Sequence, residues 1–483
     1  MAPADQAFDV STNSVPSQHD VNLEDENELK QPQPGVTSDQ APHVPHESIA
    51  TLNEVKPEDD DEFDQPDTVS DSSTLVYDHE AFDTFRHRVA EFVLTLWDGA
   101  KASDIEVTRM SGGGFNRVIS ITRTIPRQQK SMLACSFKRL WTFIADRSTK
   151  MRHDTCQPRC LDYILRIPRF DAAQLDRDVA ALRYVQKLRS IPVPDVVAFD
   201  ETPNNKLGSP YMLQNRLSGT DLLHTFHRLD HDQKCRVAEE LGRVFHAMLS
   251  RKCPVAGKLI LPHTVSSSKD DGDQICVEPL FQSELPTRGQ VKHNLATKDL
   301  LTEIFEERKE GFEDMGNNFE AGYMNRFSAM AIELHAEGWF ANNDISVCHL
   351  DFEPRNILID ITKDAPQPII SGILDWDSAA LAPSFMSCKP PLWIWAWADD
   401  EDEDERTAND EPPNEEGRVL KRTFEQAAGP EFAGYAYPSA YRLARRLLRF
   451  AMDEMRSTED FNEADAMLEE WAELRKSSAI VDT

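Results

Sequence analysis

The stretch "VCHLDFEPRNILID", residues 347–360, places three polar residues inside an apolar frame. The apolar residues at its two ends are typical of short buried strands, but they do not explain His349, Asp351 and Asn356 between them. The five-residue step from Asp351 to Asn356 lets a loop turn back, so that both side chains face one cleft. Two interpretations are open: a polar turn between two strands, with His349 satisfied by backbone groups, or a centre of catalysis.

A second stretch lies at a fitting distance downstream. "GILDWDSAA", residues 372–380, is a short apolar strand that ends in Asp375, nineteen residues beyond Asn356. The segment between the two strands, "DITKDAPQPIISG", is rich in turn-forming residues. We therefore predict a hairpin that brings Asp375 back beside Asn356.

Transfer of a phosphoryl group from ATP requires few protein groups. A carboxylate orients or deprotonates the attacking hydroxyl, an Asn and an Asp hold Mg²⁺ on the phosphates, and a cation contacts the phosphates from the opposite wall. The pattern H-x-D-x-x-x-x-N, followed by an aspartate on the next strand, contains the first set of these groups. The paired stretches thus favour catalysis over a polar turn.

The two stretches "HLDFEPRNILI" and "ILDWDSA" together resemble the aminoglycoside phosphotransferase family, close in pattern to its choline-kinase-like relatives and its many fungal members. The likeness extends over roughly residues 76–475 and includes "GGGFNRVI", "YILRIPR" and "LGSPYMLQNRLSG". It implies an α+β, bilobal protein-kinase-like fold with a small β-rich N-lobe and a larger helical C-lobe. By resemblance, Asp351 is the catalytic base, His349 organises its loop, and Asn356 and Asp375 are Mg²⁺ ligands.

The front half contains candidates for contacts with the nucleotide phosphates. In "SGGGFNR", Gly112, Gly113 and Gly114 would let backbone N–H groups approach phosphate oxygens. The segment is not G-x-G-x-x-G, and a simple hairpin turn is the alternative. In "DYILRIPRF", Arg166 stands where kinases place a lysine, and the partner on the following helix would be Asp178 instead of a glutamate. The longer Arg compensates for the shorter acid; the alternative is an Arg at a strand edge.

A basic segment interrupts the front half. Residues 123–160 hold nine Lys or Arg against two acidic residues, and they contain His153, Cys156 and Cys160. A zinc site, a flexible basic loop and translated intron sequence are three open interpretations, since the spacing matches no common zinc pattern. Further on, "PPLWIWAW" suggests core packing rather than an acceptor pocket, and Asp377 either contacts the metal through water or caps a turn.

Composition limits the other classes of function. The net charge of −32 argues against nucleic acid or an anionic membrane as the main partner. Residues 1–75 hold 18 Asp or Glu against two Lys, with scarcely any aromatic residue, which predicts a disordered acidic tail. We find no signal peptide and no long apolar run. Eight scattered cysteines fit a reducing, cytoplasmic setting. The oligomeric state stays open.

The sequence therefore predicts three segments: the tail to residue 75, an N-lobe over 76–215 that binds the nucleotide, and a C-lobe over 216–483 with the catalytic loop and acceptor site. The expected activity is ATP- and Mg²⁺-dependent phosphoryl transfer to a hydroxyl of a small molecule. The alternative is a catalytically inactive pseudokinase that acts as a nucleotide-binding or scaffold module, because the substitutions at the phosphate-contacting positions depart from the kinase pattern.

Overall fold

The first sheet is antiparallel and has five strands. The computed structural model describes residues 80–110, 116–125, 159–169, 175–262, 275–281, 291–363, 367–396, 404–453 and 455–481. The predicted tail, the glycines Gly112–Gly114 and the basic segment between residues 126 and 158 lie outside these ranges. The strands are β1 (Ile105–Arg109), β2 (Asn116–Ile125), β3 (Arg159–Pro168), β4 (Val196–Asp200) and β5 (Tyr211–Asn215), in the order β1-β2-β3-β5-β4.

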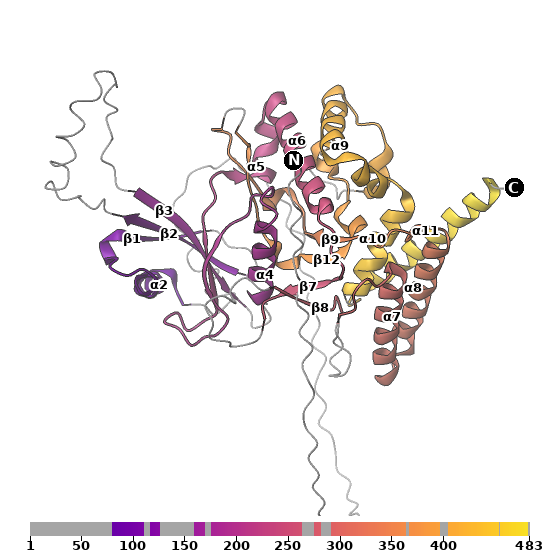
Figure 1. The fold of residues 1–483 in the computed structure, drawn as a ribbon, viewed down its shortest axis with the longest axis horizontal. Coiled ribbons are helices and arrows are strands. Elements are labelled where there is room, and N and C mark those ends of the chain that lie inside the picture. Colours follow the sequence, from indigo (N-terminus) through magenta and orange to yellow (C-terminus); the bar gives the residue numbers. More distant parts are fainter. Residues whose placement is uncertain are drawn as a thin grey trace, which may run out of the picture. The chain divides into compact units, whose positions relative to one another are not determined.

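The register of this sheet gives its two faces different tasks. Opposed residues on neighbouring strands share a face, and side chains alternate between faces along each strand. Ile119, Leu165 and Leu213 lie on one face and pack under α2 (Phe82–Leu96) in a small hydrophobic core (Figure 1). The opposite face carries Arg166 and Gln214. One face thus stabilises the sheet and leaves the other for polar groups.

The helix α4 (Leu175–Gln186) follows the third strand, as predicted, and ends before Pro192. Its buried residues, among them Val179 and Leu182, belong to the large hydrophobic core that contains the later helices. The helix therefore connects the front sheet to the rest of the chain by packing. The predicted boundary at residue 215 stays a prediction.

Behind the sheet the chain is mainly helical. The helices are α5 (Leu222–Thr225), α6 (His231–Ser250), α7 (Thr297–Asp314), α8 (Asn318–Ala336), α9 (Glu415–Ala436), α10 (Ser439–Met452) and α11 (Thr458–Val481). Helices α7 and α8 lie side by side, and α6 packs against α9 (Figure 1). Buried residues such as Val237, Leu241 and Phe245 recur at helical spacing along α6, which explains why that face enters the core.

Two small sheets frame the predicted site. One contains β6 (Thr220–Asp221), β10 (Ile357–Ile359) and β11 (Ile370–Ile373) in the order β11-β10-β6. The other contains β7 (Gly257–Ile260), β8 (Cys276–Glu278), β9 (Ile345–Cys348) and β12 (Ala380–Pro383) in the order β8-β7-β12-β9. Gly219 has a φ of 108° and passes so close to the carbonyl of Ile359 that a Cβ would collide with it.

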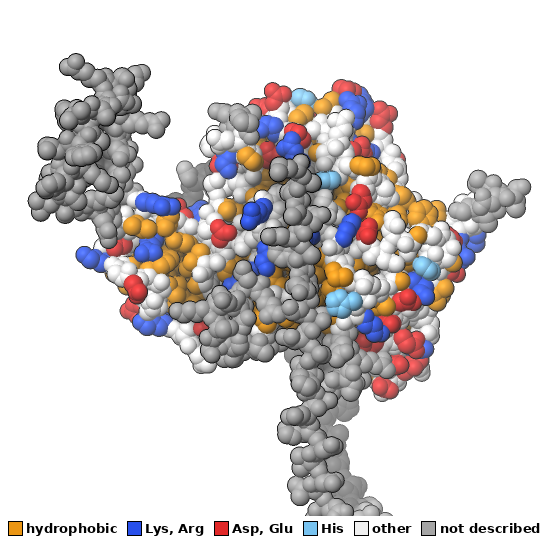
Figure 2. All heavy atoms as spheres, viewed as in Figure 1, with side chains coloured by type: hydrophobic (Ala, Val, Ile, Leu, Met, Phe, Trp, Pro, Cys, Tyr) orange, Lys and Arg blue, Asp and Glu red, His pale blue; other side chains and the backbone are white. Residues whose placement is uncertain are grey.

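On the face drawn in Figure 2, acidic and basic side chains are mixed over the described part of the chain. Many form exposed ion pairs, such as Arg326 with Asp465 at 2.8 Å. Exposed pairs of this kind contribute about 0–1 kcal/mol each, so the cores and not these pairs hold the fold. None of the described helices is both long and apolar enough to cross a membrane.

Candidate functional site

The loop between β9 and β10 carries the polar centre of the opening stretch. His349 is 2% exposed, and its Nε2–H donates to the carbonyl of Leu374 at 2.8 Å. Its ring also packs edge-on against Trp376, with centroids 4.5 Å apart. Burial lowers the pKa of His349, so the ring is neutral at pH 7. His349 therefore joins the Asp351 loop to the Asp375 loop, and its organising role stays a prediction.

Asp351 and Asn356 face one another, as their spacing predicts. The Nδ2 of Asn356 donates to Asp351 Oδ2 at 3.0 Å and to the Asp351 carbonyl at 2.9 Å. The side-chain nitrogen of Asn356 is therefore engaged by Asp351, and the side-chain oxygen is the atom of this amide that is left for another partner. The other carboxylate oxygen of Asp351 accepts from Arg355 Nη2 at 2.6 Å. Two donors thus hold the Asp351 carboxylate in one orientation.

The predicted hairpin brings Asp375 to the same place. Strands β10 and β11 pair antiparallel, and the N–H of Leu374 donates to the carbonyl of Asn356 at 2.8 Å. Asp375 itself has a φ of 62°, and Leu350, just before Asp351, has a φ of 65°. Left-handed backbone is costly for residues other than glycine, by about 1–3 kcal/mol each. One loop therefore has a strained residue beside Asp351, and in the other the strained residue is the predicted metal ligand Asp375 itself.

Arg166 connects the front sheet to this hairpin. Its Nη2 lies 3.1 Å from Asp375 Oδ1 and 3.5 Å from Asp178 Oδ2. The Arg166 side chain is 12% exposed, so the guanidinium is largely withdrawn from water. Burial alone would lower the pKa of Arg166, but the surrounding carboxylates Asp178, Asp375 and Asp377 raise it overall. The Arg166–Asp178 pair expected from the sequence is present, and the contact with Asp375 is an additional one.

Asp178 has an unusual environment on α4. It is 7% exposed, and its Oδ1 has no hydrogen-bond partner in the described structure. Burial raises the pKa of Asp178 to about 7, although the Arg166 charge acts in the opposite direction. The Arg166–Asp178 attraction therefore depends on pH near neutrality.

These side chains border one cavity of about 590 Å³. Its lining includes Asp351, Asn356 and Arg166, together with Gln214 and Asn215 from the end of β5. Asp178 is not in the lining; it acts on the cavity through Arg166. Asp377 lines the cavity and accepts from Ser378 Oγ at 3.4 Å, which leaves both of its predicted roles open.

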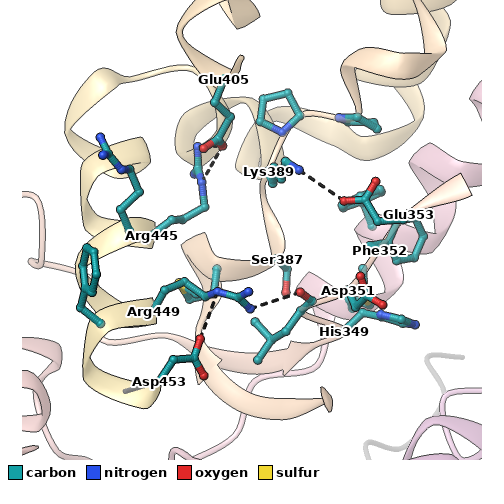
Figure 3. Close-up of a pocket in the computed structure, with 18 of the residues that line it drawn as sticks. His349, Asp351, Phe352, Glu353, Ser387, Lys389, Glu405, Arg445, Arg449 and Asp453 are labelled. Atoms are coloured by element: carbon teal, nitrogen blue, oxygen red, sulfur yellow. Dashed lines mark hydrogen bonds and ion pairs between the residues drawn. The ribbon is translucent and has the colours of Figure 1, made fainter. Parts of the chain in front are cut away.

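A second cavity of about 490 Å³ begins at the other side of Asp351, which lines both. Arg449 extends from α10 towards the loop that carries Asp351, and the Lys389–Glu353 pair stands on the opposite wall (Figure 3). Arg445 is more firmly held, because it pairs with Glu405 at 2.6 Å. Apolar side chains complete the lining: Phe245, Phe352, Met386 and Trp393.

The sequence prediction missed the charged wall of the second cavity. The signal that could have revealed it lies in "YRLARRLLRFA", residues 441–451, where the arginines recur at the spacing of one helix face. The tryptophan motif was interpreted as core packing, and Trp395 packs against Phe424 in the core with ring centroids 5.7 Å apart. Trp393 is also buried in the core, and it lines the second cavity as well. The proposed zinc residues His153 and Cys156 lie outside the described residues.

Comparison with known proteins places this geometry in a family. The family model described as "Phosphotransferase enzyme family" matches residues 145–386, half of the chain. The chain belongs to the phosphotransferase enzyme family. The matched region includes Arg166 and the whole hairpin with Asp351 and Asp375. This match confirms the resemblance found in the sequence. The β-rich part and the helical part of the structure confirm the predicted α+β class.

Individual relatives of this family member are distant. "Altered inheritance of mitochondria protein 9, mitochondrial" from Candida tropicalis is 27% identical over 150 residues, which cover 28% of the chain and 22% of that protein. The chain thus spans about a fifth of that relative. Matched solved structures include the GDP complex of wild-type aminoglycoside 2'-phosphotransferase-IIIa (13% identity, 80% of this chain and 98% of that one, TM-score 0.40). Another is aminoglycoside phosphotransferase APH(4)-Ia, with 14% identity, coverage of 81% of this chain and 98% of that one, and a TM-score of 0.42.

The oxygen donors of the first cavity fit a magnesium ion. The side-chain amide oxygen of Asn356 and the carboxylate of Asp375 are hard ligands, which Mg²⁺ prefers. Mg²⁺ usually takes its remaining ligands from phosphates and water. Within the described ranges no group of three or more His, Cys, Asp or Glu is arranged to hold a metal. The protein would therefore supply two ligands, and the ion would neutralise phosphate charge.

Proposed function

We propose that the protein is a nucleotide-dependent phosphotransferase that moves the γ-phosphate of ATP to a hydroxyl of a small molecule. The observation that carries this proposal is the position of Asp351, which lines both cavities. A base must contact the attacking hydroxyl while the phosphates lie beyond it. One cavity then holds the nucleotide and the other the acceptor.

Other residues of the first cavity would bind Mg²⁺ and the phosphates. Asn356 and Asp375 would hold Mg²⁺, and Arg166 would place a permanent positive charge beside the phosphates. Arg166 contacts Asp375 at 3.1 Å in this structure. Ion binding at Asp375 would draw that carboxylate into coordination and leave the guanidinium with more donors for phosphate oxygens. His349 would keep the two loops in register through its hydrogen bond to the Leu374 carbonyl.

The second cavity supports a polar acceptor. Arg449 is about half exposed, and its contacts with the Leu350 carbonyl and Asp453 are 3.4 and 3.5 Å long. Lys389 is likewise about half exposed and lies 3.4 Å from Glu353. Such loosely held charges can exchange partners with a ligand at little cost. We propose that they bind polar substituents of the acceptor while Phe352 and Trp393 contact its carbon skeleton.

The proposal is tested in two stages. Thermal unfolding is first measured with and without millimolar ATP and Mg²⁺, and we expect stabilisation only with both. ATP consumption is then screened against a panel of hydroxylated metabolites, with Asp351→Asn as the inactive control. An acceptor that stimulates consumption by the wild type alone supports the proposal. Nucleotide binding without turnover of any acceptor would favour the pseudokinase alternative instead.

A further inference from the structure

The loop that carries Asp351 also places a cation beside it. Arg355 belongs to the short 3₁₀ turn Pro354–Asn356, directly before Asn356. Its Nη2 donates to Asp351 Oδ1 at 2.6 Å, and its side chain is 57% exposed. Within the described part of the chain, Asp351 is the partner that the structure gives this guanidinium. A guanidinium has five N–H donors, so the others remain available to a ligand.

Arg355 lines the first of the two cavities that meet at Asp351. Among the described residues, those that line the second cavity include Asp351 but not Arg355. Asn356, whose side-chain nitrogen donates to Asp351 Oδ2 at 3.0 Å, also lines the first cavity. Both carboxylate oxygens of Asp351 are therefore held by side chains of the first cavity. A phosphate on an ion bound to Asn356 would lie beside the neighbouring Arg355.

The Arg355–Asp351 pair contributes little to the fold. Exposed ion pairs are weak, because water screens the charges and two side chains lose conformational freedom. Asn356 already orients the Asp351 carboxylate through its other oxygen. A purely structural role therefore leaves a permanently charged side chain at this position unexplained.

A cation beside the base has an electrostatic purpose. Asp351 must come close to the γ-phosphate to deprotonate a hydroxyl that attacks it, and both groups are negative, so they repel one another. Arg166 is shared between Asp178 and Asp375, at 3.5 and 3.1 Å. Arg355 is already in contact with the base, so its charge compensates the repulsion between the base and the phosphate.

We propose that Arg355 is a further catalytic residue, which binds the γ-phosphate while it is transferred. This inference rests on the proposed function, because it requires ATP in the first cavity. The acceptor oxygen forms a bond to the γ-phosphorus, the bond from that phosphorus to the bridging oxygen breaks, and its electron pair stays on ADP. The hydroxyl proton moves to Asp351. Arg355 donates N–H groups to the γ-phosphoryl oxygens and neither gains nor loses a proton.

This contact strengthens during the reaction. Before the transfer, the Arg355 charge is shared between Asp351 and the γ-phosphate. Once Asp351 has taken the proton it is neutral, and the guanidinium then interacts with the transferred group alone. An interaction that is stronger in the transition state than in the ground state lowers the barrier. Loss of Arg355 should therefore lower turnover more than it lowers ATP affinity.

The experiment compares the full-length wild type with Arg355→Met in two measurements. Dissociation constants are first measured for ATP and for ADP in the presence of Mg²⁺. Arg355→Met should bind ATP about 10-fold more weakly, because it lacks a charge-assisted hydrogen bond. It should bind ADP as tightly as the wild type, because ADP has no γ-phosphate. The rate of ATP hydrolysis, with water as the acceptor, is measured next and should fall about 10²- to 10³-fold.

Two further variants complete the comparison. Arg243→Met is the matched control, because Arg243 forms an exposed ion pair with Glu239, four residues before it on α6, and lines neither of the two cavities. It should match the wild type in both measurements. Arg355→Lys keeps the positive charge on a single ammonium group, so its ATP affinity should lie between those of the wild type and Arg355→Met.

Several results would overturn the inference. An equal loss of ATP and ADP affinity in Arg355→Met, no loss of either, or an unchanged rate of hydrolysis would each do so. If the wild type binds ATP without hydrolysing it, the comparison of ATP with ADP decides. If Arg355→Met does not fold, Arg355→Lys must show the selective loss of ATP affinity. These failures would leave the proposed function intact, whereas absence of all nucleotide binding by the wild type would overturn both.

Discussion

Replacement of Arg166 by methionine should destabilise the protein in a pH-dependent way. Removal of one partner of a buried ion pair typically costs about 3–5 kcal/mol, since it leaves a buried charge uncompensated. Asp178, however, has a pKa of about 7 with Arg166 present. Without the guanidinium this pKa rises further, so Asp178 is neutral at pH 7 and no bare charge stays buried. We expect a loss of about 1–2 kcal/mol at pH 6, from the remaining contacts of Arg166.

The sign of the pH dependence follows from linkage. An acid whose pKa is higher in the folded than in the unfolded protein binds more protons when folded, so stability falls as pH rises between the two values. For the wild type this window runs from about 4 to about 7. In Arg166→Met the window extends above pH 7, and each further pH unit costs up to about 1.4 kcal/mol. The difference from wild type should therefore reach about 3–5 kcal/mol at pH 9.

Urea unfolding followed by circular dichroism at pH 6, 7 and 9 measures this difference. The double variant Arg166→Met with Asp178→Asn should be more stable at pH 9 than Arg166→Met alone, because it has no carboxyl group to ionise. Arg422→Met is the control, since Arg422 is 59% exposed and pairs weakly with Glu415 at 3.5 Å. The reasoning fails if Arg166→Met loses the same free energy at pH 6 and pH 9, or if the double variant is no more stable.

Three further outcomes concern activity. Asp351→Asn should leave nucleotide affinity nearly unchanged and lower kcat about 10²- to 10⁴-fold, because this side chain would contact the hydroxyl and not the nucleotide; an unchanged kcat would contradict its assigned role. Asp375→Asn should weaken Mg²⁺-dependent ATP binding, since an amide is a poorer ligand for a hard cation, and titrations at several Mg²⁺ concentrations would detect this; an affinity equal to that of wild type would exclude Asp375 as a ligand. Arg449→Gln should raise KM for the acceptor but not for ATP, with Arg326→Gln as an exposed control, and equal effects on both substrates would argue against a separate acceptor cavity.

Much of the site could be predicted because its signals are local. Asp351 and Asn356 are only five positions apart. The hairpin that returns Asp375 is set by a turn-rich connection between two apolar strands. Hydrogen bonds such as that from Leu374 to Asn356 arise from the hairpin itself. The same holds for the helix α4 and the strands β1 to β3, whose apolar periodicity is visible in the sequence.

The tertiary structure decided the contacts between distant segments. Arg166 and Asp375 are 209 positions apart, so no local sequence pattern could predict the contact between their side chains. The charged wall around Arg449 depends on which face of α10 turns towards the second cavity, and packing settles that. Local periodicity reports that a face is buried, but only the assembled cores determine what it is buried against. The sequence alone thus determined the loop from Asp351 to Asn356 and its hairpin, and the fold determined which charged and polar side chains surround them.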